Sequence, residues 1–411
     1  MPRLRARARE VRTELQVRLA PEAYRTQLTA AKSGTDTEVA VYFADGPNCL
    51  YQLDQWLPVV ERLAESHPVV LVLRDWGVMR QVQERTTLPV VCVRNGGDLA
   101  ALYDACNLKV CLYVNNSFRN FQSLSHSRML HVHVNHGESD KLSSFSNQVK
   151  AYDRVLVAGP VALQRYRSAL IGFDHSKVLA VGRPQLDLEF GPDLPDSPRR
   201  TVLYAPTWEG DFAANNWTSL DVLGPQIVAG LLDVPDVRVV YKPHPRVADS
   251  PKPGMADAHK RVMSLIRSAN TRDPGADHVA RVQGNVLAMF DQCDAFVGDV
   301  SSVPLDFLYL RPDAPILLTD RRGDRPLLLA ATPLAQAVPI VDSATVTDIS
   351  QVVVAELADD VHHAGRNRAR ARYFGELGPG QSTAAFITTI AELIDERDTL
   401  VTGRQPTAVG E

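Results

Sequence analysis

The chain has 411 residues, of which 45% are hydrophobic and 22% are charged, and its formal net charge is −4. This length is too great for one ordinary hydrophobic core and suits a globular protein of two domains. The acidic balance argues against a general nucleic-acid binder, whose binding domain should be basic.

The cysteines and the apolar runs of the sequence indicate the cellular compartment of the protein. The five cysteines form no C-x-x-C pair and mostly fall within apolar runs, so we expect buried thiols in a reducing compartment, and neither disulfides nor a zinc site. No apolar run approaches the roughly 20 residues that span a bilayer. The N-terminus also lacks the apolar core of a secretory signal. We therefore expect a cytoplasmic protein.

Residues 1–34 predict a basic amphipathic helix. Apolar residues recur at three- to four-residue spacing from Leu4 to Leu19, between arginines. Such a helix suits the surface of an anionic membrane, which would place the protein peripherally on the inner face of the cell membrane. A solvated helix that docks on its own domain or stays loose fits the pattern equally well.

Residues 35–188 alternate β-branched runs with helical patterns. Amphipathic segments at Leu53–Ala64, Leu99–Ala105 and Val161–Leu170 separate several of the runs. Continuous apolar strands joined by helices predict a parallel sheet that is covered on both faces. The predicted strands are Val39–Ala44, Val69–Arg74, Val90–Arg94, Val110–Val114, His131–Asn135, Val155–Ala158 and Val178–Val181.

A linker is predicted at residues 189–200, where prolines and a glycine cannot continue a helix or a strand. The alternation then resumes over residues 201–380, so we expect an α/β fold of two doubly wound domains. A C-terminal helix is expected over 381–398, with a disordered tail at 399–411. The strands predicted in the second domain are Thr201–Ala205, Arg238–Tyr241, His278–Val282, Ala295–Val297, Ile316–Thr319 and Pro339–Val341.

His136 is expected at the tip of a strand, because it follows the alternation that begins at His131 and precedes Gly137. Histidine is the residue most easily used as a base near neutral pH. Glu138 or Asp140 is expected to orient the imidazole. With His131 and His133 the ring could suggest a metal site, but the strand is of the buried type and no matching ligands follow, so we do not expect a metal.

Lys242, His244 and Arg246 alternate at the end of a strand, stiffened by two intervening prolines. If all three project together, they make an anion site suited to a diphosphate. The competing interpretation is a stiff loop with solvated charges. We favour the anion site, because a buried-type strand ends in this cluster.

Ser301 and Ser302 lie at a strand-to-helix turn, after Asp299 and before Asp306. The unpaired N–H groups and the positive end of the helix dipole make such a turn a natural phosphate seat, although Asp and Ser are also ordinary helix caps. Ligands of doubly wound sheets lie outside the carboxyl ends of the strands, where these motifs fall.

Thr207 and Gly210 follow the first strand of the second half and can approach a ligand, while Trp208 offers a stacking face or simply packs between the domains. The sequence contains no Walker-type loop, no G-x-G-x-x-G after the first strand and no G-x-S-x-G. ATP hydrolysis, ordinary NAD chemistry and serine hydrolysis are therefore disfavoured.

Taken together, these stretches resemble the CDP-glycerol glycerophosphotransferase family, which includes teichoic-acid primases and polymerases. The resemblance runs in order from about Val110 to Ser382 and is carried by the combination of motifs. The matching stretches are His136 to Lys141, Leu203 to Trp208, Lys242 to Pro245 and Asp299 to Asp306, with weaker matches at Tyr373 to Gly375 and at Gly380 to Ser382.

The resemblance implies the GT-B architecture, in which two Rossmann-like domains face each other across a cleft. It implies that His136 is the base on an acceptor hydroxyl and that His244 stabilises the donor diphosphate, with Arg246 nearby. Ser301 and Ser302 would hold the donor phosphates. Glu138 is a further candidate catalytic residue, and the other candidate substrate-binding residues are Gly137, Lys141, Thr207, Lys242, Asp299, Asp306, Gln381 and Ser382.

The resemblance also implies the reaction. A glycerol phosphate, or a related alditol phosphate, would pass from a CDP-linked donor to a lipid-linked or glycan acceptor in teichoic-acid-like or capsular polymer synthesis, with release of CMP. We expect no cofactor and no nucleic-acid partner, and the oligomeric state stays open, including a homo-oligomer. Two alternatives remain, namely a GT-B glycosyltransferase that uses a nucleotide sugar and a non-catalytic nucleotide-binding assembly protein.

Overall fold

The first half of the chain forms a seven-stranded parallel sheet in the computed structural model, which describes residues 37–210, 212–378 and 380–403. Its strand order is β3-β2-β1-β4-β5-β6-β7. The predicted helix at 1–34 and the end of the predicted tail lie outside the described residues. The strands are β1 (Val39–Phe43), β2 (Val69–Leu73), β3 (Val90–Cys92), β4 (Val110–Tyr113), β5 (Leu130–His133), β6 (Arg154–Val157) and β7 (Val178–Ala180).

Alternate side chains of this sheet face two separate helix layers. Val39, Val41 and Phe43 of β1 point into a core with α4, α5 and the C-terminal helix α15. Ala40 and Tyr42 point to the other face, against α6 and α8. This is the period-2 alternation of a strand that is buried on both faces. The helices of this half are α3 (Tyr51–Asp54), α4 (Leu57–Ala64), α5 (Trp76–Gln83), α6 (Gly96–Ala105), α7 (Phe121–Leu124) and α8 (Pro160–Ala169).

The second half forms a six-stranded parallel sheet in the order β10-β9-β8-β11-β12-β13. Helices α9, α10 and α13 pack on one face of this sheet, and α11, α12 and α14 pack on the other. The strands are β8 (Arg200–Ala205), β9 (Val237–Tyr241), β10 (Val279–Ala280), β11 (Ala295–Gly298), β12 (Ile316–Thr319) and β13 (Ile340–Val341). The helices are α9 (Gly224–Leu232), α10 (Pro253–Arg272), α11 (Ser302–Leu310), α12 (Arg325–Ala331), α13 (Ile349–Ala358), α14 (His363–Phe374) and α15 (Gln381–Thr402).

Each predicted strand is present, with ends within two residues of those predicted, so the expectation of two parallel α/β sheets is confirmed. The helices differ more from the predictions. The segment predicted at 53–64 is split into α3 and α4, and α15 continues to Thr402, where a disordered tail was expected. Of the cysteines, Cys92, Cys111 and Cys293 are buried and the other two are partly exposed.

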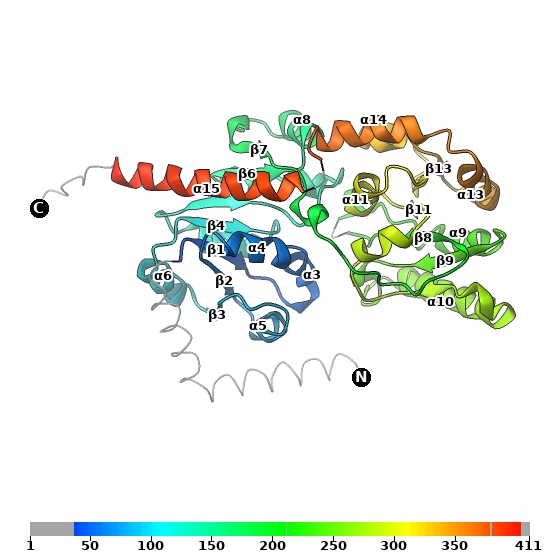
Figure 1. Cartoon of the computed structure of the whole chain (residues 1–411), viewed down its shortest axis with the longest axis horizontal. Helices are drawn as coiled ribbons and strands as arrows, with labels where there is room; N and C mark the ends of the chain where they lie inside the picture. The colour runs from blue at the N-terminus through cyan, green and yellow to red at the C-terminus, as the bar shows by residue number, and fades with distance from the viewer. Residues whose placement is uncertain (1–36, 211, 379, 404–411) are drawn as a thin grey trace, which may run out of the picture.

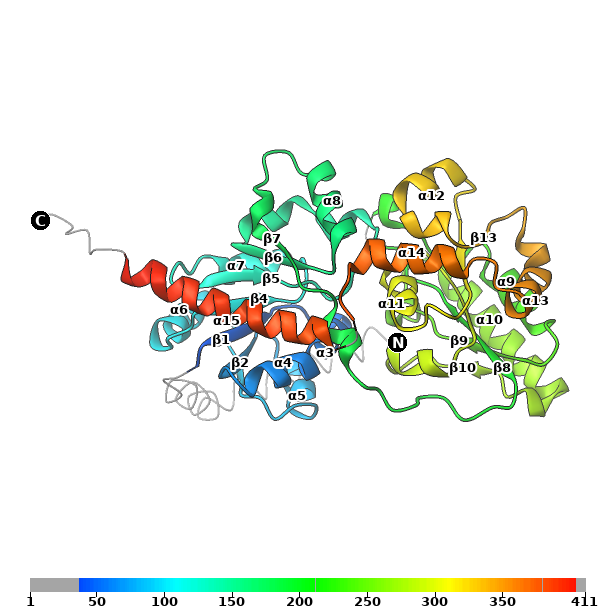
Figure 2. The same cartoon turned by 45° about the horizontal axis from the view of Figure 1, so that its top comes forward.

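The two halves lie side by side, and the last two helices connect them (Figures 1 and 2). Helix α14 packs on the second sheet and also contacts α8 and α11. The chain then returns to the first half, where Phe386, Ile390 and Leu393 of α15 enter the core under β1. Among the described helices, none is both long enough and apolar enough to cross a membrane.

Candidate functional site

The turn after β5 places His136 at the carboxyl edge of the first sheet. Asn135 has a left-handed backbone with φ of 52°, a conformation that asparagine tolerates better than most residues. Its side chain brackets the turn, because its oxygen accepts the His136 N–H at 2.9 Å and its amide donates to the Gly137 carbonyl at 3.1 Å. The Trp56 indole donates to the Asn135 carbonyl. The position of His136 is thus fixed by its neighbour.

The His136 imidazole is a neutral base at neutral pH. The ring is partly buried, and its Nδ1 is buried with no hydrogen-bond partner among the described residues. Burial, with smaller contributions from the charges of Arg183 and Lys141, lowers the pKa of His136 to about 4. A neutral ring with a free lone pair can accept a proton from a substrate hydroxyl.

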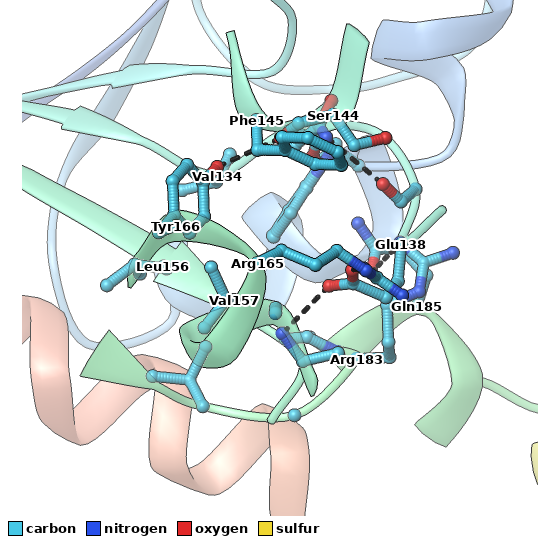
Figure 3. A pocket seen from close by; sticks show the side chains of 18 residues that line it. Val134, Glu138, Ser144, Phe145, Leu156, Val157, Arg165, Tyr166, Arg183 and Gln185 are labelled. Atoms are coloured by element: carbon cyan, nitrogen blue, oxygen red, sulfur yellow. Dashed lines mark hydrogen bonds and ion pairs between the residues drawn. The ribbon is translucent and has the colours of Figure 1, made fainter. Parts of the chain in front are cut away.

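Glu138 and Asp140 do not orient this ring, so that expectation was wrong. Both carboxylates pair with Arg165 of α8, which lies beside Glu138 behind the turn (Figure 3). Glu138 also accepts the Ala158 N–H at 3.3 Å. The reason is geometric, because the turn directs these side chains toward α8, whereas His136 faces the second half.

Asp140 also joins the two halves of the chain. It accepts hydrogen bonds from the Thr332 hydroxyl at 2.5 Å and from the Tyr373 hydroxyl at 2.6 Å. Its side chain is almost completely buried, and these two donors with Arg165 satisfy the carboxylate. Asp140 therefore helps to clamp the His136 turn against α14.

Two further residues of the turn meet the second half. The Lys141 ammonium donates to the Thr207 hydroxyl at 2.9 Å, and burial lowers the pKa of Lys141 to about 8. Gly137 lies against Ser302 so closely that a Cβ on Gly137 would lie 2.8 Å from the Ser302 Cβ. The two motifs that the sequence predicted at separate sheet edges are therefore in contact.

The close approach at Gly137 makes a direct prediction. We expect Gly137→Ala to separate the turn from α11 by a few tenths of an ångström and to lower kcat/KM about tenfold, since small misplacements are costly to catalysis. Turnover and the free energy of unfolding would be measured together. Gly191→Ala is the matched control, because a Cβ there meets nothing within 4 Å. Equal activity in the two variants would contradict the prediction.

Asp299 supports the loop around Thr207 from below. One carboxylate oxygen accepts the Thr207 N–H at 2.7 Å, and the other accepts the Ser219 N–H at 3.0 Å and the Thr319 hydroxyl at 2.6 Å. The residue is fully buried. The structure therefore places Asp299 beneath the predicted binding surface, where it shapes the loop.

His244 lies at the carboxyl end of β9 with a defined tautomer. Its Nδ1 accepts the Arg246 backbone N–H at 3.2 Å, so in the neutral ring the proton resides on Nε2. Burial, with smaller contributions from the nearby charges of Lys141, Arg246 and Lys242, lowers the pKa of His244 well below its usual value. His244 is thus a neutral hydrogen-bond donor through Nε2.

The three basic residues of this motif were expected to project together, but in the structure they do not. The Arg246 guanidinium lies 3.7 Å above the Trp208 ring, and the His244 ring centroid lies 6.0 Å from the same ring. Lys242 is buried and donates to the Val282 carbonyl at 3.3 Å. The reason is packing, because the Lys242 side chain is buried within the fold while the Arg246 guanidinium stacks on Trp208.

Tyr51 contacts both histidines, and this role was not predicted from the sequence. Its ring centroid lies 5.9 Å from that of His136 and 5.2 Å from that of His244, with edge-on geometry in both cases. Gln52 donates to the Tyr51 hydroxyl at 3.2 Å. The base candidate of one half and the diphosphate candidate of the other half therefore pack against the same tyrosine ring.

The serine turn lies against the turn that carries His136, because Ser302 touches Gly137. Ser301 is the N-cap of α11, its side chain makes no capping bond, and its Oγ is buried with no partner among the described residues. Ser302 begins the helix and touches Gly137. A buried hydroxyl at the positive end of a helix can bind a phosphate oxygen.

Two predicted residues lie elsewhere. Gln381 accepts the Gly378 N–H at 2.9 Å at the start of α15. Ser382 is fully buried against Gly182, where a Cβ would lie 2.1 Å from its Oγ. The structure thus places both at the crossover between the halves, where the chain returns to the first sheet.

No group of three His, Cys, Asp or Glu residues that could hold a metal ion is found in the described part of the chain. His131 is engaged by the Tyr113 hydroxyl and the His126 carbonyl, and the His133 ring packs in a tilted arrangement on Tyr152 with ring centroids 5.0 Å apart. These two histidines are thus packed within the first half.

Comparisons with known structures agree with this architecture. The wall teichoic acid polymerase TagF, in a structure soaked with CDPG, is 12% identical and matches with a TM-score of 0.56 over 95% of this chain and 99% of its own. The glycotransferase of kitacinnamycin is 14% identical, with a TM-score of 0.54 over 87% and 98% of the two chains. MnaA of S. aureus with UDP is 10% identical, with a TM-score of 0.51 over 91% and 100%. The fold is therefore of the GT-B type.

A sequence match supports the resemblance to a known family. A family model described as CDP-glycerol:poly(glycerophosphate) glycerophosphotransferase matches residues 123–319. This segment is therefore similar to that family of enzymes, as the motifs suggested. The segment contains every predicted site residue from His136 to Asp306 and excludes Gln381 and Ser382. A search of curated protein sequences finds no match.

Proposed function

We propose that this enzyme transfers glycerol phosphate, or a related alditol phosphate, from a CDP-linked donor to a hydroxyl of a lipid-linked or glycan acceptor. The observation that carries the proposal is that His136 and His244, from opposite halves, both pack on Tyr51, while the serine turn touches Gly137 beside His136. The family match supports the choice of a CDP-glycerol-type donor. Teichoic-acid-like or capsular polymer synthesis is the setting that such a reaction serves.

In this proposal His136 acts on the acceptor. The acceptor oxygen attacks the β-phosphorus of the donor, its proton passes to the free lone pair of His136, and the bond between the β-phosphorus and the bridging oxygen breaks to release CMP. The lowered pKa keeps His136 ready to accept the proton at neutral pH. General-base help of this kind contributes about 10²- to 10⁴-fold to a rate.

The second half would stabilise the donor phosphates. His244 donates through Nε2, Arg246 lies beside it over Trp208, and the N-terminus of α11 with Ser301 offers backbone N–H groups and a free hydroxyl. These donors are fixed before the reaction and partly shielded from water. Phosphoryl transfer depends mainly on such positioning and electrostatic stabilisation.

A donor panel tests the proposal. Purified enzyme would be incubated with a membrane extract as acceptor and with CDP-glycerol, other CDP-alditols, UDP-sugars or GDP-sugars, and nucleotide release would be followed by chromatography. We expect CMP from a CDP-alditol. Release of UDP or GDP instead would support a nucleotide-sugar glycosyltransferase. Binding of CDP-glycerol without any product in the presence of acceptor would support a non-catalytic protein.

Ser302→Ala gives a narrower prediction. Removal of one hydroxyl at the helix N-terminus should weaken CDP-glycerol and CMP binding about tenfold, the usual size for a hydrogen bond to a charged group. The kcat at saturating donor should change less than the dissociation constant. Isothermal titration would measure the affinity, with the exposed Ser168→Ala on α8 as the control. If Ser302→Ala bound CDP-glycerol with the affinity of the wild type, the assignment of the serine turn to the donor site would be wrong.

A further inference from the structure

Arg183 has no assigned role, yet it contacts both the His136 turn and helix α11. It follows β7, directly after Gly182, and its side chain is almost completely buried (Figure 3). Its guanidinium donates to Asp306 through Nη2 at 2.9 and 3.0 Å and through Nε at 3.2 Å. Its Nη1 donates to the His136 carbonyl at 3.2 Å and to the Gln185 side chain at 3.3 Å.

The two partners of Arg183 belong to the two reacting sides. His136 is in the turn that carries the proposed base. Asp306 is one helical turn beyond Ser302 on α11, so its carboxylate moves with the serine turn. A planar guanidinium can satisfy both partners at once, because its five N–H donors form a rigid fork. One side chain therefore joins the base turn to the donor helix.

From this arrangement we infer that Arg183 is a positioning residue, which sets the distance between the His136 imidazole and the donor phosphates by tying the His136 carbonyl to Asp306. The inference rests on the proposed function. It also corrects the expectation for Asp306, which was predicted to bind substrate. Its carboxylate is fully engaged by Arg183, and the residue is 3% exposed, so it faces the joint between the halves.

The effect of Arg183 on the position of His136 can be separated from its effect on the stability of the fold. Loss of the ion pair with Asp306 and loss of the hydrogen bond to the His136 carbonyl have different consequences. Breaking a buried ion pair from one side leaves an unpaired charge, whereas replacing both partners with apolar side chains of similar size is often neutral for folding. The hydrogen bond to the His136 carbonyl cannot be replaced in this way. A variant that is Arg183→Met and Asp306→Leu should therefore keep its stability and lose the tie to His136.

The experiment compares this double variant with the wild type in thermal unfolding, CDP-glycerol binding and turnover. We expect a Tm close to that of the wild type and an unchanged Kd for CDP-glycerol, with kcat lower by about 10- to 100-fold, the cost of a misplaced catalytic group. Asp306→Asn should lose less, because its amide oxygen still accepts from Arg183 and the bond to His136 remains. The matched control is Arg366→Met with Asp360→Leu, since Arg366 is fully buried and makes a two-pronged pair within the second half.

A second readout needs no substrate. Hydrogen–deuterium exchange of residues 135–141 in the unliganded protein should be faster in the Arg183 and Asp306 double variant and unchanged in the control. A wild type that releases no CMP from CDP-glycerol would refute the proposed function alone, and the exchange result would still decide the role of Arg183. A double variant with both the kcat and the Tm of the wild type, or with unchanged exchange at residues 135–141, would overturn the inference.

Discussion

His136→Ala is expected to lower kcat about 10²- to 10⁴-fold, which is the contribution of a general base. The Kd for CDP-glycerol should stay close to that of the wild type, because the donor phosphates are assigned to residues of the second half. Steady-state kinetics and isothermal titration on the same preparation would measure both quantities. His363→Ala, on the exposed start of α14, is the control. Normal turnover of CDP-glycerol by His136→Ala would refute the assignment of the base.

The pH dependence of the wild type gives an independent check on His136. The ring must be neutral to accept a proton, and burial lowers its pKa from 6.5 to about 4. The protonated, inactive form therefore accumulates only as the pH falls toward 4, so the acid limb of kcat/KM should lie well below pH 6.5. This parameter reports groups of the free enzyme. An acid limb centred near pH 6.5 would indicate an ordinary exposed histidine instead.

His244→Ala is expected to lower kcat about 10²- to 10³-fold, the usual cost of removing one fixed donor that stabilises transition-state charge. His244→Gln should recover part of the loss, because its amide offers an N–H near the position of Nε2. A base could not be rescued by glutamine, so this pair of variants separates a donor from a base. Both rates would be measured at saturating CDP-glycerol.

The outcome for glutamine decides the role of His244. If His244→Gln were as inactive as His244→Ala while both variants bound CMP like the wild type, His244 would transfer a proton and would not act as a donor. Equal activity of all three proteins would exclude His244 from the reaction. The bond from the Arg246 N–H to Nδ1 favours the donor role, because it leaves the ring proton on Nε2.

The sheets were predictable because their strands are short, continuous apolar runs between polar connections. Val69–Leu73 is an example, since five buried apolar residues in a row have few other ways to fold. Helix boundaries were less predictable. The pattern from Leu53 to Ala64 is amphipathic throughout, yet a proline at position 58 starts a new helix and divides it.

The site was predictable only in part. The motifs around His136, His244 and Ser302 follow strand ends, and the carboxyl ends of parallel strands gather at one edge. Contacts between distant side chains left no local trace in the sequence. Arg165 captures Glu138 and Asp140 from α8, and no spacing rule links these positions.

Tyr51 and Arg183 show the same limit. Tyr51 lies in a short helix after β1 and resembles any partly buried tyrosine, until both imidazoles are found against its ring. In the sequence Arg183 resembles a surface arginine, because its partner Asp306 lies 123 residues later in the chain. Only the packing of the two halves against each other reveals these residues.

The central claim is that histidines from both halves of the chain meet one donor. The most direct test follows the ring nitrogens of His136 and His244 by NMR, assigned with His→Gln variants, while CDP-glycerol is titrated into the wild type. We predict that both rings shift and that both shifts saturate with the same Kd. Movement of one ring alone, or of neither ring at a donor concentration that saturates binding by calorimetry, would contradict a donor site shared by the two histidines.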